Sequence, residues 1–171
     1  RRDSMNSRNC GIKQIRRCGR NWNEAVDLFD RALREIEGMT DEQTETSRET
    51  ERFHLWLGLE HLLREVWDKD RAKRAALVKR LRTELPEDEE FLRRYPPFRM
   101  NHALARFLLG ARRAIEAAAG RGARQEHEAR VAAQHFKIAT SPYTEGANET
   151  TPWVEEVRVW LRKAAKIDLV V

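Results

Sequence analysis

Apolar residues recur every three or four positions along most of the chain, which is the spacing of one face of an α-helix. The first such stripe predicts a helix from about Trp22 to Glu37, with Gly38 as its stop. The second predicts a helix from about Thr46 to Trp67, in which Thr46 and Glu49 are spaced as a capping box. Its apolar arc is wide, so we expect it to be the most central helix. The residues expected to be buried on it are Trp56, Leu59, Leu63 and Trp67.

Two further helices are predicted before the middle of the chain. Asp70 is placed to cap a third helix that runs to about residue 85. Pro86 suits the first turn of a short helix with acids at its start and Arg93 and Arg94 at its end, an order that fits the helix dipole. This helix has to end before Tyr95-Pro96-Pro97, because a residue before proline avoids the helical region.

The second half of the chain predicts three longer helices. Two cover about Asn101–Ala119 and Ala123–Ala139, and the third starts at Thr151-Pro152 and extends to about Lys166. The apolar tail Ile167–Val171 fits a short strand, a docked end or a continuation of the helix. No segment alternates with period two over the length of a strand, and no repeat has a solenoid period.

These stripes predict an all-α protein. At 171 residues the chain is long enough for one domain with a real core and too short for two ordinary ones. We expect a single-domain bundle of five to six helices with short loops over residues 21–171, preceded by a flexible or weakly helical basic arm over residues 1–20. No apolar run approaches the roughly 18 residues of a membrane span, so we expect a cytoplasmic protein without a membrane partner.

Charge is segregated along the chain, whose net charge is +5. Residues 1–20 hold seven bases and one acid, whereas residues 24–51 hold ten acids and three bases. Residues 71–82 hold six bases and no acid, and residues 91–137 hold ten bases and three acids. On a helical wheel five of these bases spread over the side opposite Leu77 and Leu81, which predicts a basic surface facing solvent; they are Arg71, Lys73, Lys79, Arg80 and Arg82.

A basic surface of this kind attracts polyanions, and nucleic acid is the commonest polyanion inside a cell. The sequence therefore favours a non-catalytic helical subunit of a larger nucleoprotein assembly, which contacts the backbone of RNA or single-stranded DNA and needs no cofactor. The residues expected to bind nucleic acid are Arg16, Arg17, Arg20, Arg71, Lys73, Lys79, Arg80, Arg82, Arg93, Arg94 and Arg99. Tyr95 is a candidate for stacking on an unpaired base, and the same segment also suits a rigid hinge.

Two other interpretations of the charge pattern stay open. The acidic first helix and the basic later helices can meet each other, within one chain or head to tail between copies. This describes a helical interaction module that docks other protein subunits or forms a homo-oligomer. In the simplest interpretation the charges only solvate the outer faces of the helices.

Histidines are the main catalytic raw material in the chain. Arg130 and His135, like Arg121 and His127, have the spacing Arg-x(4–6)-His, and in this the chain resembles the HEPN-type ribonucleases, which are small helical bundles. The resemblance covers two residues of the motif and implies that an Arg and a His act together on an RNA phosphodiester, usually across a dimer. His135 also falls on the inward stripe beside Phe136, where a core histidine is expected. A HEPN-like ribonuclease with Arg130 and His135 as its catalytic pair is therefore the third hypothesis.

No metal site is expected. Glu51 and His54 form one Glu-x-x-His unit, but a di-iron bundle needs two such units and a Glu from each of two more helices. Cys10 and Cys18 have no ligand partners at metal spacing and are expected to be free thiols. The sequence has no phosphate-binding glycine loop and no nucleophile elbow.

Overall fold

The computed structural model of the chain describes residues 27–28, 30–32, 34–35, 38 and 45–171. Every regular element among these residues is a helix and none is a strand, so the fold is all-α, as the apolar stripes predict. The chain divides into two compact units, a first unit (Arg1–Leu81) and a second unit (Arg82–Val171). The basic arm over residues 1–20 lies outside the described residues, and the single domain over 21–171 stays a prediction.

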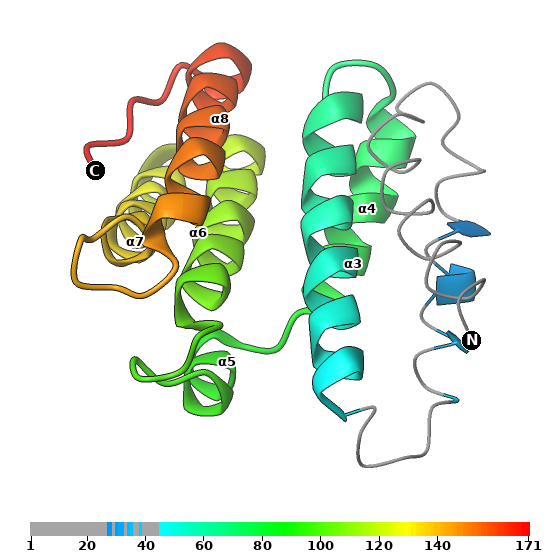
Figure 1. The fold of residues 1–171 in the computed structure, drawn as a ribbon. Coiled ribbons are helices and arrows are strands. Elements are labelled where there is room, and N and C mark those ends of the chain that lie inside the picture. Colours follow the sequence, from blue (N-terminus) through cyan, green and yellow to red (C-terminus); the bar gives the residue numbers. More distant parts are fainter. Residues whose placement is uncertain (1–26, 29, 33, 36–37, 39–44) are drawn as a thin grey trace. The chain divides into compact units, whose positions relative to one another are not determined.

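The first unit contains α3 (Glu45–Val66) and most of α4 (Arg71–Glu84), which lie side by side and run in opposite directions (Figure 1). Both match the predicted helices to within two residues. The Asp70 carboxylate accepts hydrogen bonds from the backbone N–H groups of Ala72 (2.9 Å) and Lys73 (3.1 Å), which confirms the predicted cap of α4. The described residues between 27 and 35 are helical, in agreement with the first predicted helix. The side chain of Thr46 is not described, so its capping box stays a prediction.

α3 is buried on almost all sides, since every residue from Leu55 to Glu60 is buried. The predicted burial is confirmed for Trp56, Leu59, Leu63 and Trp67, which are at most 5% exposed. Glu60 is the charged member of this apolar run. Its carboxylate accepts a hydrogen bond from Arg64 Nε at 2.9 Å, and such pairing is what allows a charge to be buried.

The second unit consists of α5 (Asp88–Arg94), α6 (His102–Ala119), α7 (Gly122–Ala139) and α8 (Ala147–Ala165). α6, α7 and α8 run up, down and up as a three-helix bundle, and α5 packs against α6 (Figure 1). α6 contacts the other three helices and is the centre of the unit. Its many alanines favour the helical state and are small enough to let neighbouring helices approach.

α6 and α7 approach each other closely at Gly110. Gly110 on α6 faces the ring of Phe136 on α7, and a Cβ atom at position 110 would overlap that ring. Phe136 is also stacked against Phe107, with ring centroids 6.0 Å apart. Because the ring is fully buried and held on both sides, only glycine fits at position 110 without a shift of the core.

The starts of α5 and α8 differ in detail from the prediction, and the structure selects one of the alternatives for the C-terminal tail. α5 begins at Asp88 after its N-cap residue, so Pro86 precedes the helix instead of lying in its first turn. α8 begins one turn before Thr151-Pro152, because Gly146 takes a left-handed conformation (φ 83°) that redirects the chain into the helix. The tail Ile167–Val171 forms neither helix nor strand, and Leu169 within it is buried, as in the docked alternative.

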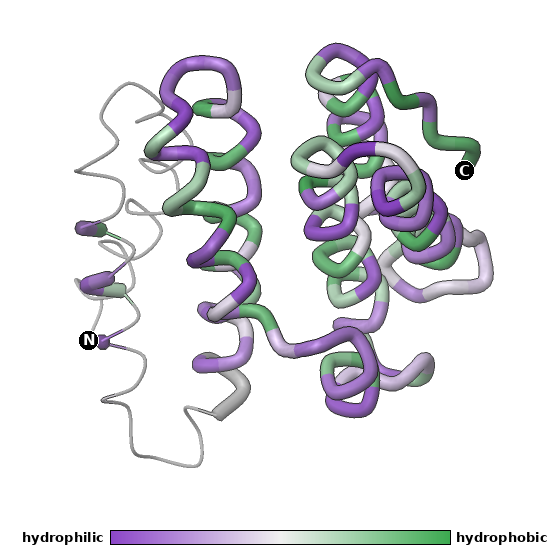
Figure 2. The backbone as a smooth tube through the Cα atoms, turned by 180° about the vertical axis from the view of Figure 1, so that it is seen from behind, coloured by the Kyte–Doolittle hydropathy of each residue, from purple (hydrophilic) through white to green (hydrophobic). Residues whose placement is uncertain are grey.

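Hydrophobic and hydrophilic stretches alternate along the helices of both units, and the C-terminal tail is largely hydrophobic (Figure 2). This alternation is the three-dimensional counterpart of the stripes in the sequence. Among the described residues, none of the helices combines the length and the apolar character needed to cross a membrane.

Candidate nucleic-acid interface

The predicted nucleic-acid-binding residues of the first unit lie on α4. Arg71 and Lys79 are exposed, while Lys73 and Arg80 are half-buried. Arg80 forms an ion pair with Asp30, which belongs to the acidic segment of the chain. Part of the predicted basic surface is thus neutralised within the chain. Outside the described residues lie Arg16, Arg17 and Arg20.

Among the predicted nucleic-acid-binding residues of the second unit, all except Arg99 form an ion pair with a glutamate. Arg82 donates two hydrogen bonds to the carboxylate of Glu116. Arg93 and Arg94 pair with glutamates one turn earlier on α5, but these pairs are exposed, so they add little to stability and leave the cations accessible. Arg99 is exposed and has no acidic partner within the described residues.

A row of basic and polar side chains runs along the outer side of α7. We call it the α7 stripe, and its members are Arg124, His127, Arg130, Gln134 and Lys137. All five are exposed, and their spacing of three or four residues places them on one face of the helix. From the first to the last the stripe spans roughly 20 Å along the helix axis.

Carboxylates do little to neutralise this stripe. Arg130 and Lys137 form no ion pair with any described residue, and Arg124 has only a long contact of 3.9 Å to Glu116. Glu128 of α7 turns inward and accepts a hydrogen bond from Arg113 at 3.0 Å, so it does not face the stripe. The remaining acid of α7, at position 126, is exposed beside the stripe. The stripe therefore presents net positive charge to solvent.

Two loops meet at the end of the bundle where α7 stops. Residues 95–101 connect α5 to α6, residues 140–146 connect α7 to α8, and a Cβ atom on Gly146 would lie 3.8 Å from the Met100 carbonyl oxygen. Three large side chains on these loops are exposed, namely Phe98 (98%), Met100 (73%) and Tyr143 (97%), and we call them the aromatic tip. Arg99 lies within the tip, so apolar surface and positive charge occur together there.

Tyr95, the candidate for stacking on an unpaired base, is buried, so its ring is not available to a base. Its ring packs edge to face against Phe91 with centroids 5.1 Å apart, and its carbonyl oxygen accepts a hydrogen bond from His102 Nδ1 at 2.7 Å. The sequence contained the signal, because Tyr95 follows Phe91 by one helical turn and so shares its face. Phe98, beyond the two prolines, is the exposed aromatic of this segment.

A chain of hydrogen bonds links α5, α6 and α7 inside the second unit. Asp88 at the start of α5 accepts hydrogen bonds from Arg112 and Arg113 of α6, and it lies 2.9 Å from His135 Nε2 of α7. Arg106 Nη1 lies 3.1 Å from His135 Nδ1. Because arginine only donates, Nδ1 must accept, which places the ring proton on Nε2 facing Asp88. The prediction of a buried, satisfied histidine at position 135 is confirmed.

The network holds its ionisable groups in defined charge states. Burial alone would raise the pKa of Asp88, but the hydrogen bond from His135 and the charges of two arginines outweigh it and hold that pKa well below its ordinary 3.8. Burial lowers the pKa of His102 below 6.5, and the charge of Arg106 adds to this effect against the hydrogen bond to Tyr95. Near neutral pH the unit therefore contains an anionic Asp88 and a neutral His102.

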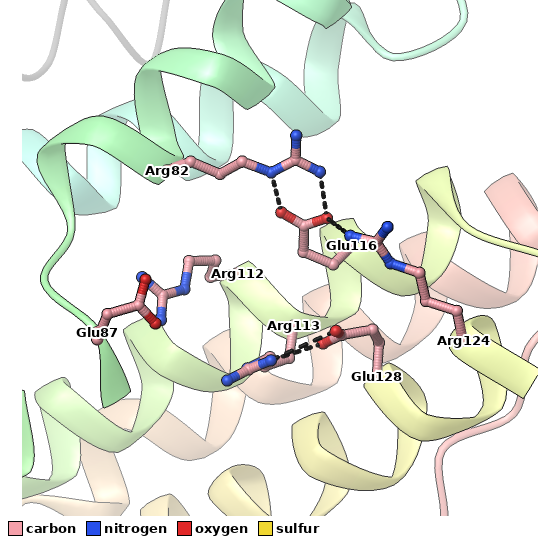
Figure 3. Close-up of a pocket in the computed structure, with 7 residues that line it drawn as sticks. All are labelled: Arg82, Glu87, Arg112, Arg113, Glu116, Arg124 and Glu128. Carbon is pink, nitrogen blue, oxygen red and sulfur yellow. Dashed lines mark hydrogen bonds and ion pairs between the residues drawn. The ribbon is translucent and has the colours of Figure 1, made fainter. Parts of the chain in front are cut away.

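The second unit also has a pocket of about 220 Å³ (Figure 3), lined by Arg82, Glu87, Arg112, Arg113, Glu116, Arg124 and Glu128. Its cations face its own carboxylates, since Arg82 and Arg124 approach Glu116 and Arg113 donates to Glu128. Burial raises the pKa of Glu116, but the hydrogen bond and charge of Arg82 outweigh burial and lower it overall. Arg112 pairs with Asp88 outside the lining, so each arginine of the pocket already meets a carboxylate of the same unit, and we assign the pocket no ligand.

Arg130 and His135 face different surroundings. Arg130 is exposed in the α7 stripe, whereas His135 turns inward to Asp88 and Arg106. Five positions on a helix correspond to side-chain directions about 140° apart, so the two cannot converge within one chain. The ribonuclease hypothesis stays a prediction that would need a second chain. Among the described residues, no three His, Cys, Asp or Glu side chains gather closely enough to hold a metal ion.

Comparison of the chain with protein-family models, with curated proteins and with solved structures gives no match. The functional argument therefore rests on the geometry of this chain. The α7 stripe and the aromatic tip are the two surface features that the contacts within the second unit leave unexplained.

Proposed function

We propose that this protein is a non-catalytic helical subunit that binds the backbone of RNA or single-stranded DNA within a larger nucleoprotein assembly. The α7 stripe makes the central contacts. The observation that supports this most is that Arg130 and Lys137 are exposed on one helix face with no acidic partner among the described residues. A cation in this state can neutralise a phosphate directly, and the release of condensed counterions then drives binding.

The side chains of the stripe suit phosphate oxygens. Arginine offers a planar fork of donors, lysine a compact charge, and the Gln134 amide and the His127 ring add further N–H donors. Contacts of this type fix the position of a nucleic acid but carry no information about its sequence. We therefore expect binding that depends on salt and is indifferent to base sequence.

The cations of α4 have a smaller part in this proposal than the sequence suggests. Arg80 and Arg82 already face Asp30 and Glu116, so a phosphate would have to displace a carboxylate from each. Arg71 on α4 is exposed and meets no described carboxylate, as does Arg99 in the aromatic tip. We expect Arg99 to add to the α7 stripe because both belong to the second unit.

The variant Arg130→Glu, Lys137→Glu tests the proposal. Fluorescence anisotropy with labelled single strands of unrelated sequence measures the dissociation constant at low salt. Binding should weaken at least about tenfold, by a similar factor for each sequence, because backbone contacts are lost and replaced by repulsion. A matched control reverses Lys69 and Lys163, two exposed lysines outside the stripe, and changes the net charge equally.

The control variant should bind within about twofold of the parent, since long-range attraction alone is screened by salt. Equal losses in the two variants would show that affinity follows net charge and that the stripe is not the site. A parent protein that binds none of the strands at low salt would end the proposal.

The acids of α8 favour a second candidate function, a helical assembly module. Glu149 and Glu156 are exposed on one face of the first part of α8, while Glu155 pairs with Arg158, so two acids of one copy are placed to meet the α7 stripe of another. This candidate predicts an oligomer that dissociates as salt rises and that the double reversal at Arg130 and Lys137 disrupts. Light scattering on the same samples separates it from nucleic-acid binding.

A further inference from the structure

Phe98 and Tyr143 leave almost their whole side chains in water. Their exposed fractions are 98% and 97%, and neither ring stacks on another aromatic ring of the described residues. Aromatic side chains usually bury most of their surface, so two open rings on neighbouring loops indicate a surface that meets a ligand. Met100 adds a third exposed apolar side chain to the same end of the bundle.

Positive charge lies close to Phe98 along the chain, whereas Tyr143 has the exposed Glu145 two residues away. Arg99 follows Phe98 directly and has no acidic partner among the described residues. Arg93 and Arg94 are also exposed and precede Arg99 by six and five residues. On the other loop, Tyr143 follows Lys137, the last member of the α7 stripe, by six residues. The α7 stripe, whose cations can bind phosphates, therefore ends near two aromatic rings on which bases can stack.

From this juxtaposition we infer that the ligand is a single strand whose unpaired bases stack on Phe98 and Tyr143 while the α7 stripe and Arg99 hold its phosphates. The inference rests on the proposed function and specifies its ligand. Every base has a flat face, so stacking tolerates any sequence, which agrees with a surface that offers rings and cations. A duplex hides those faces and meets only the phosphate contacts.

A protein partner fits the aromatic tip less well. A stable protein interface usually buries about 800 Å² on each side around an apolar centre. Three side chains on two loops, interrupted by Arg99, do not form such a centre. Arg99 beside Phe98 and the cations of the α7 stripe complement a polyanion, and this charge complementarity favours nucleic acid.

The test compares three probes of about 12 nucleotides or base pairs, a length that covers a single-strand site of ordinary size. They are an oligothymidine strand, an abasic strand with the same phosphates, and a duplex. Phe98→Ala and Tyr143→Ala should each weaken binding of oligothymidine about tenfold and leave binding of the abasic strand unchanged. Val159→Ala, which shortens an exposed apolar side chain on α8, is the matched control and should change nothing.

The melting temperatures of both aromatic variants should equal that of the parent, because rings that are exposed in the folded state add little to stability. Unchanged oligothymidine binding by both aromatic variants, alongside weaker binding by the Arg130→Glu, Lys137→Glu variant, would overturn the inference and leave the proposed function standing. Equal affinity of the parent for oligothymidine and the abasic strand would also overturn it. Failure of the parent to bind any probe would instead remove the proposed function.

Discussion

Asp88 connects three helices of the second unit through one side chain, since its carboxylate meets α6 through Arg112 and Arg113 and α7 through His135. A buried ion pair contributes little net stability compared with apolar packing, but removal of one partner leaves the others buried and unpaired. The network therefore constrains where α5 lies. Because α5 leads into the loop that carries Phe98, the same carboxylate supports the aromatic tip.

Asp88→Asn tests this role. The substitution keeps the shape of the side chain and removes its charge, so Arg112 loses its anionic partner and Arg113 keeps only Glu128. We expect the free energy of unfolding to fall by about 1–3 kcal/mol, measured by urea unfolding at pH 7. Glu89→Gln removes an exposed carboxylate from the adjacent position and should change it by less than about 0.5 kcal/mol. Equal effects of the two substitutions would contradict the network.

The contribution of Asp88 should also appear in the pH dependence of the free energy of unfolding. The pKa of Asp88 is lower in the folded than in the unfolded chain, so its stabilisation is complete above the ordinary value of 3.8 and is lost as the pH falls below it. The difference in unfolding free energy between the parent and Asp88→Asn should therefore shrink between pH 5 and pH 3. The lowered pKa of His102 adds a separate loss of stability as the pH falls below 6.5, because the unfolded chain takes up a proton there first.

A difference between parent and Asp88→Asn that stays constant from pH 7 to pH 3 would show that Asp88 does not act through its charge. The loss below pH 6.5 should occur in both proteins, since both keep His102. This common loss serves as an internal control for the comparison.

At the scale of helices, the sequence predicted what depends on local periodicity. α3, α4, α6 and α7 lie where the apolar stripes place them, because a stripe at helical spacing has to face a core. The start of α8 was placed one turn late, since it depends on the left-handed turn at Gly146, which no stripe records. The ion pairs of Arg80 with Asp30 and Arg82 with Glu116 join residues more than 30 positions apart, so only the fold reveals them.

Nucleic-acid binding stays a proposal, and it centres on α7 and not on α4 because carboxylates already face Arg80 and Arg82. The excess of bases over residues 91–137 is visible in the sequence, and a helical wheel of α7 would have located the α7 stripe. A helical wheel of α4 indicates a basic surface clearly because residues 71–82 contain no acid. The exposure of Phe98 and the burial of Tyr95 follow from where α5 ends, which two consecutive prolines set only approximately.

Gly110→Ala tests the close approach of α6 and α7. Alanine is the better helix former by about 1 kcal/mol, so an uncrowded site would gain stability. Here the added methyl group meets the Phe136 ring, and we expect a loss of about 1–3 kcal/mol by urea unfolding. In the double variant with Phe136→Leu the two losses should be less than additive, because the smaller side chain makes room. A stabilised Gly110→Ala protein would show that the helices are not in contact there.

At the scale of the whole molecule, some cations are engaged in ion pairs and others are available to a ligand. Arginines across both units are matched by carboxylates of the same chain, and these contacts stabilise the fold. In the α7 stripe, exposed cations that lack that match among the described residues are gathered on one helix face. The central claim is that this difference, and not the net charge of +5, determines where nucleic acid binds.

The most direct test of that claim is the salt dependence of single-strand binding. Each phosphate contact contributes roughly 0.7 to the slope of log affinity against log salt concentration on a single strand. Loss of two contacts in the Arg130→Glu, Lys137→Glu variant should reduce the magnitude of the slope by about 1.4, while the Lys69→Glu, Lys163→Glu control keeps the slope of the parent. A slope that is the same in the parent and the stripe variant would contradict the claim that the α7 stripe holds the phosphates.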